Sequence, residues 1–288
     1  MVIYPEGFAM PAGDMVLPST VRLHGLEWDV VEVDDFAFRY DYQLTSVRFP
    51  STLRRIGEAA FLGCVGLEDT LIIPKGLKRL GDNAFGDCAR LTVLLWKAVD
   101  CEGEKADGHE RSYFSRCNML CEVYVEDGVR RLSVMLFIDM VGLEQLYVGE
   151  GIEMAPNDLA ASCEALKYLS LPATMTYIDH GAFYKTALDT LVLPDSVEVV
   201  GDYSFAYCRH LRSITFGRGV TRVGNYSFTE CEALKEVVVL PTTPPDIQYT
   251  AFNEKPENVV LRVPAEAVEA YRRHPVWGTF GCIESYRL

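Results

Sequence analysis

Residues 201–216 read GDYSFAYCRHLRSITF, and this order of glycine, aromatic, cysteine and leucine returns along almost the whole chain. The aromatic side chain of Phe205 has a counterpart about every 23 residues. The equivalent positions are Phe38, Phe61, Phe85, Phe114, Phe137, Ala160, Phe183, Phe205, Phe228 and Phe252. The steps between them are 23, 24, 29, 23, 23, 23, 22, 23 and 24 residues. Self-similarity at a fixed period is the signature of a repeat architecture, so each copy is predicted to form one coil of a solenoid.

Two further positions recur within the copies. Cysteine stands three residues after the aromatic position at Cys64, Cys88, Cys117, Cys163, Cys208 and Cys231. Leucine stands six residues after it at Leu44, Leu67, Leu91, Leu120, Leu143, Leu166, Leu211 and Leu234. One coil cannot bury these side chains alone, whereas stacked coils form a continuous core. Buried free cysteine behaves as a small apolar side chain, so we interpret these cysteines as core residues; disulfides between adjacent coils are the less favoured interpretation.

A short alternating segment follows the leucine, as in Val47-Arg48-Phe49 and Ile214-Thr215-Phe216. A period of two predicts a half-buried strand, and the proline that follows many of these segments ends the ladder because it has no N–H. The sequence therefore predicts about ten stacked coils of ~23 residues with one parallel β-sheet. The other face should carry short turns or 3-10 segments and short extended pieces, with little α-helix apart from a C-terminal cap.

The repeat resembles a known family. Residues 56–67, IGEAAFLGCVGL, carry the pattern Ile-Gly-x-x-Ala-Phe-x-x-Cys-x-x-Leu almost completely, and this pattern is similar to that of the BspA-like leucine-rich repeats. The ends are also similar to the family's opening coil, with a longer turn around Gly25, and to its closing cap, which runs from Pro244 to Trp277. The resemblance implies a leucine-rich repeat solenoid that serves as a binding and display scaffold. It also implies an extracellular or cell-surface location, because the family is well represented among surface proteins of Bacteroidetes.

The repeats predict one solenoid domain over residues 1–288. Its parts are an N-terminal coil or cap at 1–38, central repeats at 39–252, and a C-terminal strand and cap at 253–288. Two places depart from the pattern. One coil has Ala160 at the aromatic position, so neighbouring side chains should fill the space. The step of 29 residues contains an insertion at 97–110, which is polar and contains glycine. It is expected to leave the solenoid as a surface loop, either functional or simply tolerated.

Composition narrows the possible partners. The formal net charge of −14 provides no basic surface for nucleic acid or anionic lipid, so neither is an expected partner. The chain contains no run of 18 apolar residues, so we expect no membrane insertion. The first 20 residues lack Lys, Arg and a continuous apolar core and do not resemble a secretory signal. Either the protein is cytosolic or the chain begins after a removed export segment.

We expect no catalytic, metal or cofactor site. Cys101, His109, Cys117 and Cys121 could be imagined as metal ligands, but their spacing fits no close-pair zinc pattern and Cys117 already has a place in the repeat. The sequence contains no Gly-x-Ser-x-Gly elbow, P-loop or dinucleotide fingerprint. Paired carboxylates for glycoside hydrolysis are not excluded by sequence, although an open solenoid offers no cleft for them. The chain is therefore not expected to be an enzyme.

The remaining candidate is the outer face of the predicted sheet. Side chains alternate along a strand, so one residue per strand points outward between two that point inward. This outward column is more apolar than a solvated face requires, and its candidate ligand-binding residues are Ile72, Leu95, Tyr124, Tyr147 and Val192, with Tyr168 to one side.

Aromatic residues also suit strands for reasons of packing alone, so a purely structural role for this column stays open. The first hypothesis is a non-enzymatic, adhesin-like scaffold that binds a protein or glycan. The second is a structural spacer or self-association module of a larger surface protein.

Overall fold

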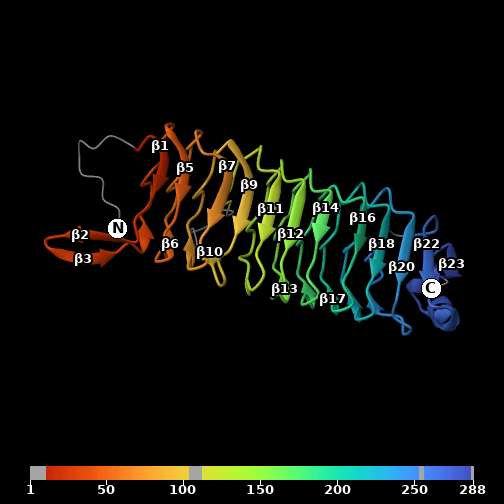
Figure 1. Ribbon diagram of the computed structural model, residues 1–288. Helices are drawn as coiled ribbons and strands as arrows, with labels where there is room; N and C mark the ends of the chain where they lie inside the picture. Colours follow the sequence, from red (N-terminus) through yellow and green to blue (C-terminus); the bar gives the residue numbers. More distant parts are fainter. Residues whose placement is uncertain (1–10, 104–111, 253–255, 287–288) are drawn as a thin grey trace.

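The computed structural model describes residues 11–103, 112–252 and 256–286. These residues form a long solenoid of parallel strands, with a hairpin at the N-terminal end and a short helix at the C-terminal end (Figure 1). The leucine-rich repeat architecture predicted from the repeats is confirmed. One face of the solenoid carries, in chain order, β1 (Gly13–Val16), β5 (Leu44–Arg48), β7 (Glu68–Ile73), β9 (Arg90–Trp96), β11 (Glu122–Val125), β12 (Gln145–Val148), β14 (Tyr168–Ser170), β16 (Thr190–Val192), β18 (Ser213–Phe216), β20 (Glu236–Val239), β22 (Val260–Val263) and β23 (Cys282–Ser285).

These strands follow one face as predicted, but their hydrogen bonds divide them into three ladders. The ladders are β1–β5, β7 to β14, and β16 to β23. The second interruption coincides with a coil that is one residue short. Leu188 follows Leu166 by 22 residues, whereas Leu211 follows Leu188 by 23. The shortened turn leads directly into β16, the first strand of the third ladder.

The second face carries two-residue strands. They are β4 (Glu32–Val33), β6 (Arg55–Ile56), β8 (Arg79–Leu80) and β10 (Glu102–Gly103) in one sheet, and β13 (Met154–Ala155), β15 (Tyr177–Ile178), β17 (Val199–Val200), β19 (Arg222–Val223) and β21 (Asp246–Ile247) in another. Each ends at a corner where the chain enters the turn around the repeated Phe. These strands are the short extended pieces expected from the sequence.

The third side consists of turns that are bonded from coil to coil. The N–H of Phe61, for example, donates to the carbonyl of Ala84 at 2.8 Å. Residues two before and two after the aromatic position have positive φ, as at Tyr203 (56°) and Tyr207 (61°) around Phe205. Left-handed backbone usually favours glycine, so the repeated use of other residues here was not predicted. The coil-to-coil hydrogen bonds stabilise this conformation.

The core contains two rows of stacked phenylalanines, separated by the coils of Phe137, whose ring contacts Trp96 edge-on, and of Ala160. In the first row, Phe38 and Phe61 have ring centroids 5.0 Å apart, and the row continues through Phe85 to Phe114. The second row runs from Phe183 through Phe205 and Phe228 to Phe252. Ala160 is fully buried between the two rows. The missing ring therefore interrupts the stack of aromatic rings without opening the core to solvent.

The six repeat cysteines are buried free thiols, as we interpreted them. Each thiol donates to the carbonyl of the aromatic residue one coil earlier. Examples are Cys64 to Phe38 at 3.0 Å and Cys163 to Phe137 at 3.0 Å. The side chain thus fills apolar space and also satisfies a buried carbonyl group, which leucine or alanine could not do.

The ends of the solenoid are closed differently. At the N-terminal end, β2 (Thr20–Leu23) and β3 (Leu26–Asp29) form an antiparallel hairpin that projects from the stack (Figure 1). Its turn at His24 and Gly25 has two positive φ values, which match the twist of a two-residue hairpin. At the C-terminal end, η1 (Ala265–Ala267), α1 (Val268–Arg273) and η2 (Trp277–Thr279) cover the last coil.

The prediction of a surface loop at 97–110 is wrong for the first half of this segment. Ala98 and Cys101 are buried, and Glu102 and Gly103 form β10 beside β8. This half continues the coil because its small side chains fit the core while its backbone adds a strand to the second face. The remainder of the loop, 104–110, lies outside the described residues.

Candidate functional site

The outward column predicted from the sequence exists as a row of register partners. Ile72 pairs with Leu95, Leu95 with Tyr124, and Tyr124 with Tyr147. Tyr168 lies in the adjacent outward column, beside Gln145. Val192 belongs to the next ladder, beyond the interruption, so the structure does not join it to the tyrosines.

The three tyrosines form a continuous aromatic row across β11, β12 and β14. The rings of Tyr124 and Tyr147 are stacked, with centroids 4.7 Å apart and planes at 5°. The ring of Tyr168 lies 4.9 Å from that of Tyr147 at a tilt of 40°. Strands lie about 4.8 Å apart, so identical register positions place neighbouring rings at van der Waals distance. We name Tyr124, Tyr147 and Tyr168 the tyrosine row.

Hydrogen bonds hold two of these rings in place. The hydroxyl of Tyr124 donates to Oε2 of Glu122 at 2.8 Å, and that of Tyr147 donates to Oε1 of Gln145 at 2.7 Å. The bond to the Glu122 carboxylate raises the pKa of the Tyr124 phenol above its ordinary value. Tyr124 and Tyr147 are half-buried, whereas Tyr168 and Ile72 are exposed by 49% and 46%. The row is therefore an ordered surface that presents ring faces and edges to solvent.

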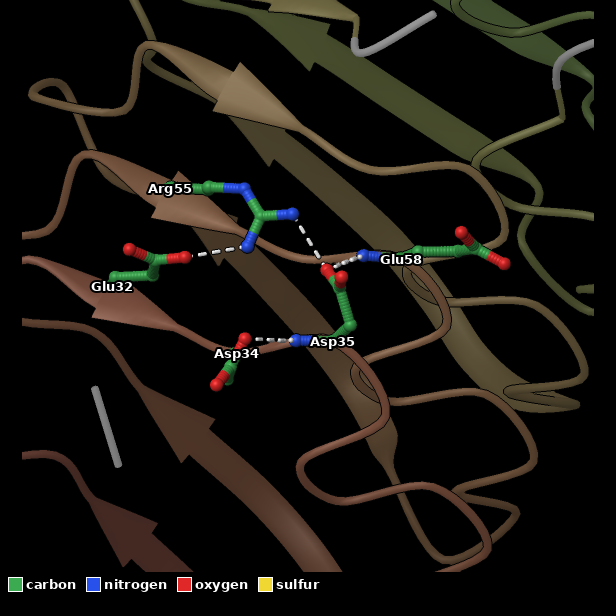
Figure 2. Close-up of polar contacts among 5 residues, drawn as sticks. All are labelled: Glu32, Asp34, Asp35, Arg55 and Glu58. Carbon is green, nitrogen blue, oxygen red and sulfur yellow. Dashed lines mark hydrogen bonds and ion pairs between the residues drawn. The ribbon is translucent and has the colours of Figure 1, made fainter. Parts of the chain in front are cut away.

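The acidic residues near the second face have structural roles. In Figure 2 the guanidinium of Arg55 contacts Glu32 and Asp35, each at 2.6 Å. Oδ1 of Asp35 also accepts the backbone N–H of Glu58 at 2.9 Å (Figure 2). This bond joins residues 23 positions apart, so the carboxylate links one coil to the next.

The same arrangement recurs where Asp202 accepts the N–H of Asn225 at 2.7 Å. These carboxylates accept hydrogen bonds from backbone N–H groups or pair with cationic side chains of the solenoid.

The cysteines that were considered as metal ligands serve other purposes. The thiol of Cys117 donates to the carbonyl of Phe85 at 3.0 Å, and that of Cys121 donates to the carbonyl of Thr92 at 3.5 Å. Cys101 is buried, and His109 lies outside the described residues. In the described part of the chain, no group of three or more His, Cys, Asp or Glu side chains is placed to hold a metal ion.

One surface feature was missed from the sequence. A hollow of about 640 Å³ opens beside the turn at Lys185 and Thr186. Its sequence signal was the step of 22 residues between Phe183 and Phe205. One shortened step in the repeat does not indicate which ligand could bind. The residues that line the hollow are brought together only in the folded structure.

Within the described residues, no helix is long and apolar enough to cross a membrane. The longest, α1, has six residues, far fewer than a bilayer-spanning helix needs.

Comparison with known proteins places the fold among bacterial repeat proteins. Six copies of the BspA type leucine-rich repeat region match residues 31–167 and 160–259. A leucine-rich repeat protein of Bacteroides ovatus has a similar structure, with a TM-score of 0.56, 20% sequence identity, and coverage of 94% of this chain and 78% of that chain. A leucine-rich cell surface protein of Faecalibacterium prausnitzii matches with a TM-score of 0.45 and 18% identity, covering 97% of this chain and 89% of that chain. No curated protein matches the sequence.

Proposed function

The chain belongs to the BspA-type leucine-rich repeat family, and from this premise we propose that it is a non-enzymatic, adhesin-like scaffold whose sheet face binds an extracellular protein. Solenoids of this class present extended surfaces for binding. The family supports an extracellular or cell-surface location. The observation that carries the proposal is the tyrosine row, which is ordered, partly exposed and continuous over three coils.

The chemistry of the row supports a protein partner over a glycan. Tyrosine supplies a large contact area with little loss of rotamer freedom, and it is enriched in protein interfaces. The hydroxyls of Tyr124 and Tyr147 are already bonded to Glu122 and Gln145. They are therefore less available for the dense hydrogen bonding that a sugar requires. Ile72 and Leu95 continue the face as apolar contact area.

The test is an array of extracellular proteins and glycans probed with three variants. Tyr124→Ala with Tyr147→Ala should weaken binding of a protein ligand by about tenfold or more, since central aromatic residues dominate interface energies. Tyr124→Phe with Tyr147→Phe should bind within about threefold of wild type, because the rings supply the contact. Thr215→Ala changes the same outward column in the next ladder and serves as the control.

Undiminished binding by a folded double-alanine variant would remove the tyrosine row from consideration. Binding of glycans alone through this face would assign it a different class of ligand. Circular dichroism of each variant checks that the solenoid is intact.

A second candidate function is self-association of a spacer module, and the projecting hairpin favours it. Leu23, Leu26 and Trp28 on β2 and β3 are exposed by 59%, 61% and 56%. An isolated two-stranded hairpin is only marginally stable in water. Contact with a second copy of the chain would bury these side chains and stabilise the hairpin.

A further inference from the structure

A shortened turn creates the hollow on the side of the solenoid that carries the phenylalanine turns. In the coil before this turn, the core leucine Leu166 stands four residues after Ser162, whose φ is positive. In the coil after it, Leu211 stands four residues after Tyr207, whose φ is also positive. In the coil between them only three positions separate Lys185 from Leu188. The middle turn is therefore recessed between its two neighbours. The resulting hollow has a volume of about 640 Å³, within the usual range for small-ligand sites.

The floor of the hollow is rigid. Thr186 stands where the repeat usually has cysteine, and it is 3% exposed. Its Oγ1 lies 3.2 Å from the carbonyl of Phe183, to which it donates, and 3.2 Å from Sγ of Cys208. Thr186 is thus bonded to buried groups of two adjacent coils, and the floor of the hollow is part of the packed core.

Two tyrosine rings line the hollow. The ring centroids of Tyr184 and Tyr207 are 5.3 Å apart at a tilt of 55°, and both side chains are half-buried. Within the residues that the structure describes, neither phenol hydroxyl has a hydrogen-bond partner, and neither does Oγ of Ser162. These tyrosines differ in this respect from Tyr124 and Tyr147. The hollow therefore combines aromatic surface with three hydroxyl groups that are available to a ligand.

Two cationic side chains, Lys185 and Arg209, line the same hollow together with the carboxylate of Glu164, in a protein whose formal net charge is −14. Nζ of Lys185 lies 2.7 Å from Oε1 of Glu164, and Nε of Arg209 lies 3.4 Å from Oε1 of Glu232. The Glu164 carboxylate raises the pKa of Lys185, while the nearby charge of Arg209 acts in the opposite direction. Both cations are exposed, by 49% and 60% of their side chains, so a ligand carboxylate can approach them beside their present carboxylate partners.

We propose that this hollow is a binding site for a carboxylated sugar, such as a sialic or uronic acid unit of a glycan. A tyrosine ring can pack against the C–H face of a sugar, and the three available hydroxyls can bond its hydroxyl groups. The guanidinium of Arg209 can hold the carboxylate through charge-assisted hydrogen bonds. An acidic peptide would use the cations but would leave the hydroxyls of Ser162, Tyr184 and Tyr207 without a defined role. The site is separate from the tyrosine row and does not depend on it.

The direct test uses N-acetylneuraminic acid and glucuronic acid as probes, with N-acetylglucosamine and glucose as neutral controls. Saturation-transfer NMR and calorimetry on the full chain measure binding. The acidic sugars should bind at least about tenfold more tightly than the neutral ones, because the charge-assisted bonds are lost with the latter.

Variants then locate the site. Arg209→Gln and Tyr207→Leu should each weaken acidic-sugar binding by about tenfold, whereas Arg209→Lys should weaken it less, because the charge remains although the planar guanidinium is lost. Arg218→Gln is the matched control, since Arg218 is also exposed and paired, with Asp195 at 3.1 Å. Insertion of one alanine between Thr186 and Ala187 restores the 23-residue step, and by filling the hollow it should abolish sugar binding.

Tyr124→Ala should bind acidic sugars like wild type, which separates this site from the proposed sheet-face function. Circular dichroism establishes that the inserted variant is folded, and the point variants test the site independently of it. The proposal is overturned if none of the four sugars binds, or if acidic and neutral sugars bind equally. It is also overturned if Arg209→Gln and Tyr207→Leu both bind like wild type, or if a glutamate-rich peptide binds in the hollow and no sugar does.

Discussion

At the scale of single residues, the repeated cysteine combines two properties that one position requires. The thiol is small and apolar enough for the core, yet it also donates a hydrogen bond to the carbonyl of the aromatic residue one coil earlier. Burial raises the pKa of Cys64 and of Cys163 to about 12, and that of Cys208 to about 11. These groups are therefore neutral thiols in the folded protein below about pH 9.

This protonation state predicts the reactivity of the cysteines toward a thiol reagent such as dithionitrobenzoate. At pH 8 the fastest thiol of the native protein should be Cys282, which is exposed, with the half-buried Cys121 reacting more slowly, and Cys282→Ser should remove the fast phase. The six repeat cysteines should react only when denaturant unfolds the chain, since only the thiolate is nucleophilic. Fast labelling of Cys163 in the native protein would contradict the interpretation.

The pKa of Cys282 itself is raised, mainly by its hydrogen bond to Glu284. A raised pKa lowers the thiolate fraction at a given pH. Glu284→Gln should therefore speed the fast phase at pH 8, which provides an internal control for the assignment.

At the scale of elements, the C-terminal cap shows how a solenoid ends. The last coil would expose its core, and α1 with η2 covers it. The hydroxyl of Tyr271 donates to the carbonyl of Pro241 at 2.9 Å, and Nε1 of Trp277 donates to that of Pro245 at 2.9 Å. Both side chains are fully buried, and the Trp277 ring contacts Phe216 and Phe252. The cap thus extends the hydrophobic core beyond the final repeat.

Truncating Trp277, which packs the cap against the last coils, should destabilise the protein from its C-terminal end. Trp277→Ala should lower the free energy of unfolding by about 3–5 kcal/mol, as for other buried aromatic truncations. Tyr271→Phe leaves a buried carbonyl without its partner and should cost about 1–3 kcal/mol. Trp28→Ala is the matched control, because Trp28 is exposed on the hairpin and its loss should change stability by less than about 0.5 kcal/mol.

Urea denaturation measures these changes, and hydrogen exchange locates them. Amides of β20, β22 and β23 should lose protection before those of β7 and β9, because each coil contacts mainly its neighbours. Equal destabilisation by Trp28→Ala and Trp277→Ala would contradict the assigned role of the cap.

At the scale of the whole molecule, the solenoid has two chemically different ends and a long open face. The apolar hairpin projects at one end, while β23 at the other end pairs with β22 on one side only among the described residues (Figure 1). The net charge of −14 opposes close approach of two copies through charged surfaces. The exposed apolar residues of the hairpin, Leu23, Leu26 and Trp28, are therefore the surface that the self-association candidate uses.

The self-association candidate predicts a mass that rises with concentration in multi-angle light scattering. Leu26→Ser with Trp28→Ser should reduce the mass to that of a monomer, because the exposed apolar area is lost. Val192→Ser, on the exposed sheet face, should leave the mass unchanged. A single monomeric mass at every concentration would contradict self-association and would leave ligand binding as the proposed function.

The sequence by itself determined the repeat, its period and the side chains that face the core. These follow from local chemistry, because every coil must place Phe, Cys and Leu at the same positions for like residues to stack. The outward column, including Tyr124 and Tyr147, followed from the alternation of side chains along a strand. The expected loop failed at Ala98 and Cys101 because composition alone did not reveal that these small side chains fit the core.

The tertiary structure alone decided how neighbouring coils are joined and what their surfaces bring together. The bond from Cys163 to Phe137 joins residues 26 positions apart, so only stacking defines it. The left-handed turns depend in the same way on hydrogen bonds between coils. The hollow arises from a single missing residue, whose effect on shape depends on the longer turns on both sides. Tyr184 and Tyr207 meet there because stacking brings residues of successive coils within contact distance, a proximity that sequence separation does not express.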